Sequence, residues 1–110
     1  MKKHQLGEFE EVVLLTVGIL HGNAYGVTIR QDIEERLNRG VSIGALQTTL
    51  RRLEKKGLLD SAHGEATAIR GGRPKLYYNI TAEGKRAIAH ARETRNALWS
   101  ALPQYVIDLK

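Results

Sequence analysis

A short run of polar side chains with helical spacing is the part of this chain best suited to specific chemistry. Gln47, Thr48 and Arg51 lie in a segment, residues 43–57, whose leucines recur at helical intervals. Glutamine can pair with adenine and arginine with guanine, and each good bidentate contact contributes about 1–3 kcal/mol of base discrimination. Base reading uses the N-terminal half of a recognition helix, where Gly44, Gln47, Thr48 and Arg51 lie. The candidate DNA-contacting residues of this segment are Ser42, Gly44, Gln47, Thr48, Arg51 and Lys55. The alternative is an ordinary amphipathic surface helix.

A second basic element follows in the stretch 70–75, which reads Arg-Gly-Gly-Arg-Pro-Lys. Two adjacent glycines let the backbone approach a phosphate closely, and the flanking basic residues supply charge. The candidate phosphate-contacting residues here are Arg70, Gly72, Arg73 and Lys75. The alternative is an exposed loop with incidental charge.

Nothing in the chain predicts an enzyme, a metal site or a cofactor. The chain has no cysteine, and its four histidines at positions 4, 21, 63 and 90 form no pair at ligand spacing. Ser42 has no histidine and aspartate partners nearby in the sequence, so helix capping explains it better than nucleophilic catalysis. Glu8, Glu10 and Glu11 suit the first turn of a helix, where the helix dipole favours negative charge.

Charge placement supports a polyanion partner. The net charge is +5, and ten of the 17 lysines and arginines but only four of the 12 acids fall within residues 39–86. A concentrated basic segment is typical of a nucleic-acid binder. A solvated basic face would have the same composition.

Length and composition predict one globular domain. The chain has 110 residues, of which 42% are hydrophobic and 26% charged. Acidic residues interrupt any apolar run near the start, and no stretch approaches the roughly 20 apolar residues of a membrane helix. We therefore expect a cytoplasmic protein that is not bound to membranes.

Hydrophobic periodicity predicts three helices in the first half of the chain. They span residues 8–21, 24–38 and 43–57, with Gly40 suited to a left-handed cap between the second and third and Ser42 as the N-cap of the third. The first is apolar on more than one face, which predicts burial against its own core and against another chain. The short turn between the second and third helices fits a helix-turn-helix.

The period then changes to that of strands. Residues 58–62 and 75–80 predict a hairpin with a long basic tip, and Thr81 precedes a final helix over 82–101 that stops near Pro103. The predicted fold class is mainly α (α+β), a winged helix-turn-helix with three N-terminal helices, a two-stranded wing and a C-terminal dimerisation helix. Residues 1–80 would form the DNA-binding part and 81–110 the dimerisation helix and tail of one compact unit.

The resemblance to a known family is carried by four sequence stretches in the right order. The segments 6–15, 24–29, 42–58 and 71–84 resemble the first helix, the Tyr-Gly start of the second helix, the recognition helix and the wing of PadR-family regulators. The resemblance covers about residues 6–100. Because a long C-terminal helical domain is lacking, the chain is similar to the short subclass.

The resemblance implies a homodimer, usually a repressor, that pairs through its first and last helices. Candidate residues for this interface, and for a small-molecule effector near it, are Phe9, Val13, Leu14, Val17, Ile88, Ala91, Leu98 and Trp99. Trp99, the only tryptophan, could stack on a flat effector, although packing of a helix end explains it equally well. The family usually carries a tyrosine where this chain has Gln47, which implies an altered operator preference.

The function that we infer from the sequence is sequence-specific transcription regulation. The partners would be double-stranded DNA, read as a pseudo-palindrome, and a second copy of the chain. The alternative is a winged-helix module that docks on protein or acts architecturally without sequence-specific regulation. A small enzyme is the third hypothesis, and no convergent polar constellation supports it.

Overall fold

The computed structural model describes residues 5–64 and 74–108. Three helices come first, α1 (Glu8–Ile19), α2 (Gly26–Leu37) and α3 (Ile43–Lys55). The strands β1 (Leu59–His63) and β2 (Leu76–Ile80) follow, then the long helix α4 (Ala82–Ala101) and the short helix α5 (Gln104–Ile107). This order confirms the predicted winged helix-turn-helix, while α5 was not predicted.

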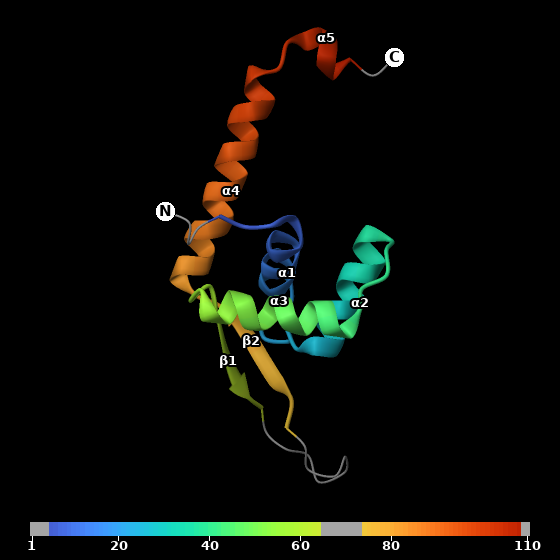
Figure 1. Cartoon of the computed structure of the whole chain (residues 1–110), viewed down its shortest axis with the longest axis vertical. Coiled ribbons are helices and arrows are strands. Elements are labelled where there is room, and N and C mark those ends of the chain that lie inside the picture. The colour runs from blue at the N-terminus through green and yellow to red at the C-terminus, as the bar shows by residue number, and fades with distance from the viewer. Residues whose placement is uncertain (1–4, 65–73, 109–110) are drawn as a thin grey trace.

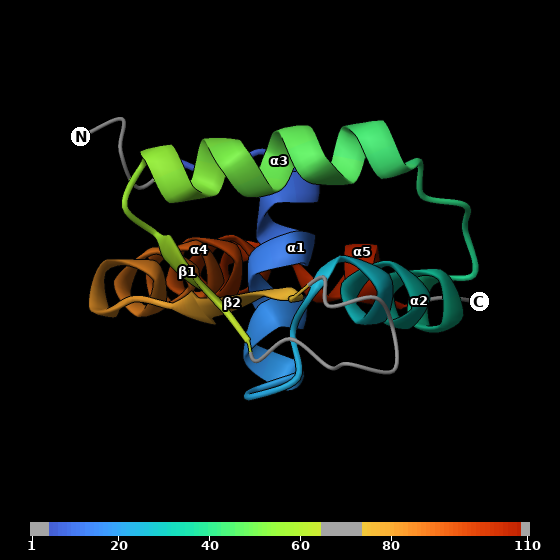
Figure 2. The ribbon, with the colours of Figure 1, turned by 90° about the horizontal axis from the view of Figure 1, so that it is seen from below.

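Helix α1 lies at the centre of the body. Figure 2 shows α3 crossing one side of α1, with α2 and the wing arranged around it. Val13, Leu14 and Val17 of α1 are at most 2% exposed, and they join the inward stripe of α3, namely Leu46, Leu50 and Leu53. Full burial of one such side chain contributes about 1.5–3 kcal/mol, so the apolar centre of α1 organises the core.

The helix ends follow local chemistry. Ser42 Oγ accepts a hydrogen bond from the Ala45 N–H at 3.0 Å, and Thr81 Oγ1 accepts one from the Gly84 N–H at 3.0 Å, so both predicted N-caps are confirmed. The left-handed residue after α2 is Asn38, with φ 52°. The prediction of Gly40 for that position was wrong, because α2 ends at Leu37 and its left-handed cap falls on Asn38, two residues before Gly40, where asparagine tolerates this conformation.

The wing is an antiparallel hairpin. Leu59 pairs with Ile80 and His63 with Leu76, so the strands lie one residue further along than predicted at their starts. The wing is joined to the helix-turn-helix where the Tyr78 N–H donates to the Ala24 carbonyl at 2.8 Å and Tyr25 forms a bridge with Tyr77. These contacts set the orientation of the wing relative to α3.

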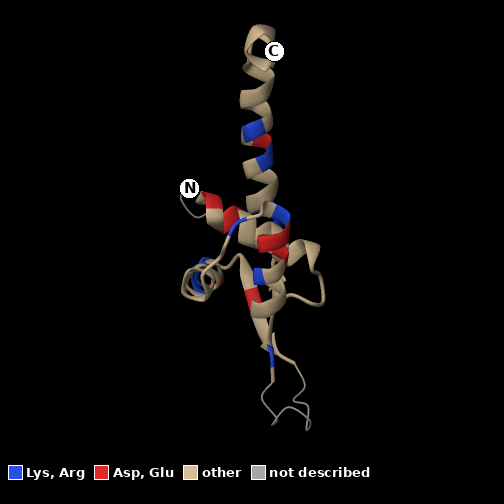
Figure 3. Cartoon of the chain, turned by 90° about the vertical axis from the view of Figure 1, so that its right-hand side faces the viewer, with Lys and Arg blue, Asp and Glu red and all other residues tan. Residues whose placement is uncertain are grey.

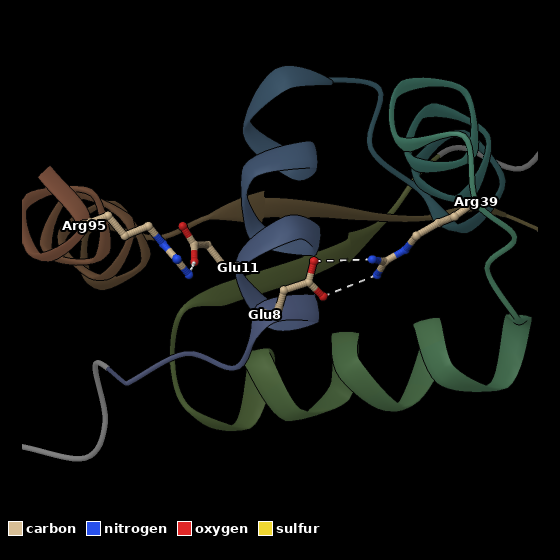
Figure 4. A network of polar contacts seen from close by, with 4 residues as sticks. All are labelled: Glu8, Glu11, Arg39 and Arg95. Carbon is tan, nitrogen blue, oxygen red and sulfur yellow. Dashed lines mark hydrogen bonds and ion pairs between the residues drawn. The ribbon is translucent and has the colours of Figure 1, made fainter. Parts of the chain in front are cut away.

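Helix α4 leaves the body as a long arm. Figure 1 shows it rising away from the other helices, with α5 at its far end and the wing on the opposite side of the body. Only Gly84 and Ala87 of α4 are fully buried. The arm is held to α1 by an ion pair between Arg95 and Glu11, 2.9 Å apart, which Figure 4 shows together with the Glu8–Arg39 pair on the other side of α1.

Gly84 fixes the point where α4 meets the wing. A Cβ added at this position would lie 2.2 Å from the Leu58 carbonyl oxygen and 2.7 Å from Ile80 Cγ1. Because one of these neighbours is backbone, a side chain cannot be accommodated without moving α4 away from the start of β1.

We predict that Gly84→Ala lowers the free energy of unfolding by about 1–3 kcal/mol, since overpacking forces a backbone shift. Gly44→Ala is the matched control, because a Cβ at that helical glycine meets nothing within 4 Å. The control should gain about 0.5–1 kcal/mol from helix propensity. Urea unfolding of both variants at one protein concentration checks this, and equal stability of the two would contradict the assigned contact.

Candidate nucleic-acid interface

Helix α3 presents one buried face and one polar face. Its three core leucines are at most 1% exposed, and Thr49 beside them is 5% exposed. The candidate residues Gln47, Thr48, Arg51 and Lys55 are all exposed on the helix surface. The sequence therefore placed these four side chains correctly on the outside of the helix.

The polar side chains on the outer face of α3 have no side-chain partners within the described residues. None of Gln47, Thr48, Arg51 and Lys55 makes a side-chain hydrogen bond or ion pair with another residue in the described ranges. Five other arginines have an acidic partner, namely Arg30, Arg36, Arg39, Arg86 and Arg95, whereas Arg52 and Arg92, like Arg51, have none within the described residues. Figure 3 shows basic residues on α3 and most of the acidic ones gathered on α1 and α2. The outer face of α3 therefore presents hydrogen-bond donors and positive charges to which a polyanion could bind.

Two other candidates at the start of α3 differ in what they offer. The Ser42 hydroxyl already caps the helix, although the residue is exposed. Gly44 is exposed and faces open space, so its position allows another backbone to approach.

The wing supplies one described candidate, Lys75, which is exposed immediately before β2. The predicted contacts of Arg70, Gly72 and Arg73 lie outside the described residues. The Gly64 N–H donates to the Lys75 carbonyl at 2.7 Å, which continues the hairpin pairing up to Lys75.

A hollow of about 420 Å³ lies between α3 and the wing, bordered by the start of α2, the outer side of α3 and β2. Its polar lining includes Tyr25, Gln47, Arg51, Glu54 and Lys75. Candidates that are separate in sequence, on α3 and on the wing, therefore share one hollow.

Tyr78 also lines this hollow, and the pKa of its hydroxyl reflects the charges nearby. Burial raises the pKa of the Tyr78 hydroxyl above its ordinary value of 10.0, and the negative charge of Glu54 raises it further. The positive charge of Arg51 acts in the opposite direction on the same pKa. The charges of Arg51 and Glu54 on α3 therefore both influence the Tyr78 hydroxyl on β2 across the hollow.

Three residues predicted for a dimer interface were misplaced. Val13, Leu14 and Val17 are buried within the core of the single chain, so they present no surface to a second copy. The periodicity of α1 predicted that it is apolar on more than one face, and only the packing of α2 and α3 decided which face they cover. The second apolar face of α1 is formed by Leu15 and Ile19, 43% and 51% exposed.

The other predicted interface residues vary in exposure. Phe9, Ile88 and Ala91 are partly buried, and the first two pack against the chain's own core. Leu98 and Trp99 on the arm are 66% and 62% exposed. Leu102, which continues the apolar pattern of the last helix in the sequence, is also exposed, and so are three apolar residues beyond it that the sequence did not single out: Tyr105, Val106 and Ile107.

The arm and α1 enclose a groove of about 540 Å³ between them. Leu15, Ile88 and Trp99 supply its apolar lining, and Lys85 and Arg92 are among its charged residues. Ile88, Ala91, Leu98 and Leu102 recur along α4 and its C-cap at helical intervals, and Arg95 interrupts this apolar stripe. Its pairing with Glu11 in the groove explains the interruption.

Comparison with known families is decisive. The model of the Transcriptional regulator PadR-like family matches residues 14–90, which include α2, α3 and both strands of the wing. The chain belongs to this family.

Solved structures agree with this assignment. A PadR-like transcription factor from Bacteroides fragilis is 28% identical, with a TM-score of 0.70, and 84% of each chain is covered. A PadR family transcription regulator from Clostridium difficile is 26% identical, with a TM-score of 0.64, over 86% of this chain and 97% of that one. RosR from H. salinarum is 25% identical, with a TM-score of 0.72, over 91% and 83%. No curated protein matches this PadR-like chain.

Two further features of the PadR-like chain concern other classes of site. Within residues 5–64 and 74–108, no three histidine, cysteine or acidic side chains cluster in a way that could hold a metal ion. In the same ranges, no helix is both long enough and apolar enough to span a bilayer.

We predict that Glu54→Gln lowers the pKa of Tyr78, because it removes a negative charge that disfavours the phenolate. Arg51→Ala should raise the same pKa, since it removes a stabilising positive charge. Alkaline titration of the labelled tyrosine ring by NMR measures both shifts. Shifts of the same sign in the two variants would contradict the placement of these charges around the hollow.

Proposed function

We propose that this PadR-like chain is a sequence-specific DNA-binding transcription regulator, a repressor that binds a pseudo-palindromic operator as a homodimer. The observation that carries the proposal is the outer face of α3, where Gln47, Thr48 and Arg51 are exposed and without intramolecular partners in the described chain. Side chains of these types read base edges when a helix lies in the major groove. Membership of a family of transcriptional regulators supports the same function, and no enzymatic role is proposed.

In this proposal the two ends of the chain have different tasks. Residues 1–80 would bind DNA, and residues 81–110 would form the arm that joins two copies. Because recognition helices of a dimer enter successive major grooves, the half-sites would lie about 10 bp apart. The hollow between α3 and the wing would follow the phosphate backbone.

The proposed dimer rests on apolar surface that a single chain leaves uncovered. Leu98, Trp99 and Leu102 on and just after α4 are exposed, as are Leu15 and Ile19 on α1. Large apolar surfaces of this kind mark interaction sites. Because Leu15 lines the groove between α1 and the arm, one two-fold contact between α1 and α4 elements would cover Leu15 together with the apolar residues of the arm.

We also propose the groove between α1 and α4 as the place where a small-molecule effector would act. Trp99 and Leu15 give it apolar walls, while Arg92 and Lys85 give it positive charge. A ligand there would contact both elements of the proposed interface, and so could change the spacing between the recognition helices of a dimer.

We predict that selection from a random DNA pool recovers a two-fold symmetric site, with affinity that falls steeply as salt increases. Gln47→Ala should relax base preference at one position in each half-site, at a cost of about 1–3 kcal/mol on the preferred sequence. Lys55→Ala is the control, because the loss of a phosphate contact weakens binding to all sequences alike. Salt-sensitive binding without an enriched sequence would instead indicate an architectural protein, and no binding would favour a protein-docking module.

We predict that Leu98→Glu converts the dimer into a folded monomer, since it places a charge in an apolar contact. The matched control is Val27→Glu, which changes a residue 55% exposed on α2, remote from the arm. Light scattering gives the mass and circular dichroism the helix content. An unchanged mass for Leu98→Glu would exclude this face as the interface.

A further inference from the structure

Lys75 at the base of the wing is held by an aromatic side chain from the helix-turn-helix. Its Nζ lies 4.5 Å from the centroid of the Tyr25 ring and donates a hydrogen bond to the Tyr25 hydroxyl oxygen at 3.3 Å. Fifty residues separate the two in the chain. The contact therefore exists only because the start of α2 lies beside β2.

Tyr25 is itself well fixed by contacts to both parts of the fold. Its N–H donates to Thr28 Oγ1 at 3.0 Å at the start of α2. Its ring meets the Tyr77 ring edge-on, with centroids 5.3 Å apart and planes at 68°. The neighbouring Ala24 carbonyl accepts the Tyr78 N–H. The tyrosine thus provides a rigid support that spans the join between α2 and the wing.

The Tyr25 ring fixes the position of the Lys75 ammonium group. Lys75, Gln47 and Arg51 line the same hollow, to which Glu54 adds a carboxylate. The Glu54 carboxylate accepts a hydrogen bond from Ser61 Oγ at 2.7 Å and would repel a phosphate. A lysine that is free to move could pair with such an acid, whereas one held on the Tyr25 ring keeps its charge available beside Arg51.

A preplaced ammonium also reduces the cost of binding. Lysine has four rotatable side-chain bonds and loses rotamer freedom when it is fixed on a ligand. If the protein orders the side chain beforehand, that loss is not incurred again on binding. The cation–π contact supplies this order without neutralising the charge, which an acidic partner would do.

We propose that Tyr25 is a positioning residue for DNA binding, which holds Lys75 in the hollow so that the ammonium meets a backbone phosphate next to Arg51. This inference rests on the proposed DNA-binding function. It assigns to the Tyr-Gly start of α2 a role in binding, beyond packing.

A double-mutant cycle tests the coupling. Affinity for the selected DNA site is measured over a range of salt for the unmodified chain, Tyr25→Leu, Lys75→Gln and the double variant. Tyr25→Leu should weaken binding about three- to tenfold when Lys75 is present, and less than about twofold in the Lys75→Gln background. Lys75→Gln should reduce the salt slope by about one, as expected for one lost phosphate contact.

Tyr25→Phe serves as a conservative variant that keeps the ring and removes the hydroxyl. It should lose about twofold in affinity and retain the salt slope of the unmodified chain. Because it preserves the packing on Tyr77, it keeps the test valid if Tyr25→Leu fails to fold.

The outcomes separate this inference from the function on which it rests. Equal losses for the Tyr25 variants with and without Lys75 would overturn the positioning role, since they would indicate direct DNA contact or general packing. A chain that shows no salt-sensitive DNA binding even when unmodified would instead overturn the proposed function.

Discussion

The whole structure depends on the enclosure of α1. This helix is apolar around most of its circumference, and Val13 and Leu14 at its centre are fully buried. It contacts α2, α3, β2 and α4, so the helix-turn-helix, the wing and the arm are all placed by packing against one element. The hydrophobic gain is non-directional, and therefore more specific contacts must set the angles at which these elements pack.

Three acids in the first turn of α1 provide such contacts. Glu8 pairs with Arg39 before α3, Glu10 with Lys56 after α3, and Glu11 with Arg95 on the arm, and two of these pairs are visible in Figure 4. The exposed Glu8–Arg39 pair contributes at most about 1 kcal/mol. Glu10 is only 7% exposed and also accepts the Gly7 N–H, so it is the more consequential contact. The Glu8 and Glu10 pairs occupy the basic residues Arg39 and Lys56 at the two ends of α3, and the basic side chains on its outer face have no acidic partner within the described residues.

The basic side chains of this small chain fall into two groups, those that pair with an acidic residue and those that do not. Ion pairs and the close approach at Gly84 join the elements, while the cations of the hollow remain available for a ligand. The one wing cation in the described chain, Lys75, is ordered by an aromatic ring and keeps its charge. The arm leaves the opposite side of the body (Figure 1), so the proposed dimer contact and the proposed DNA contact do not compete for surface.

The sequence by itself determined the elements, their order and most of their ends, because helical and strand periods and caps such as Ser42 and Thr81 are local properties of the chain. It also determined which face of α3 is polar. It could not decide which side of α1 is covered, so Val13 was assigned to an interface although it lies in the core. Only the tertiary structure showed why Arg95 interrupts the arm's apolar stripe and that Tyr25 holds Lys75. Such contacts join residues 50 or more positions apart, and their partners are chosen by packing geometry, which no local pattern records.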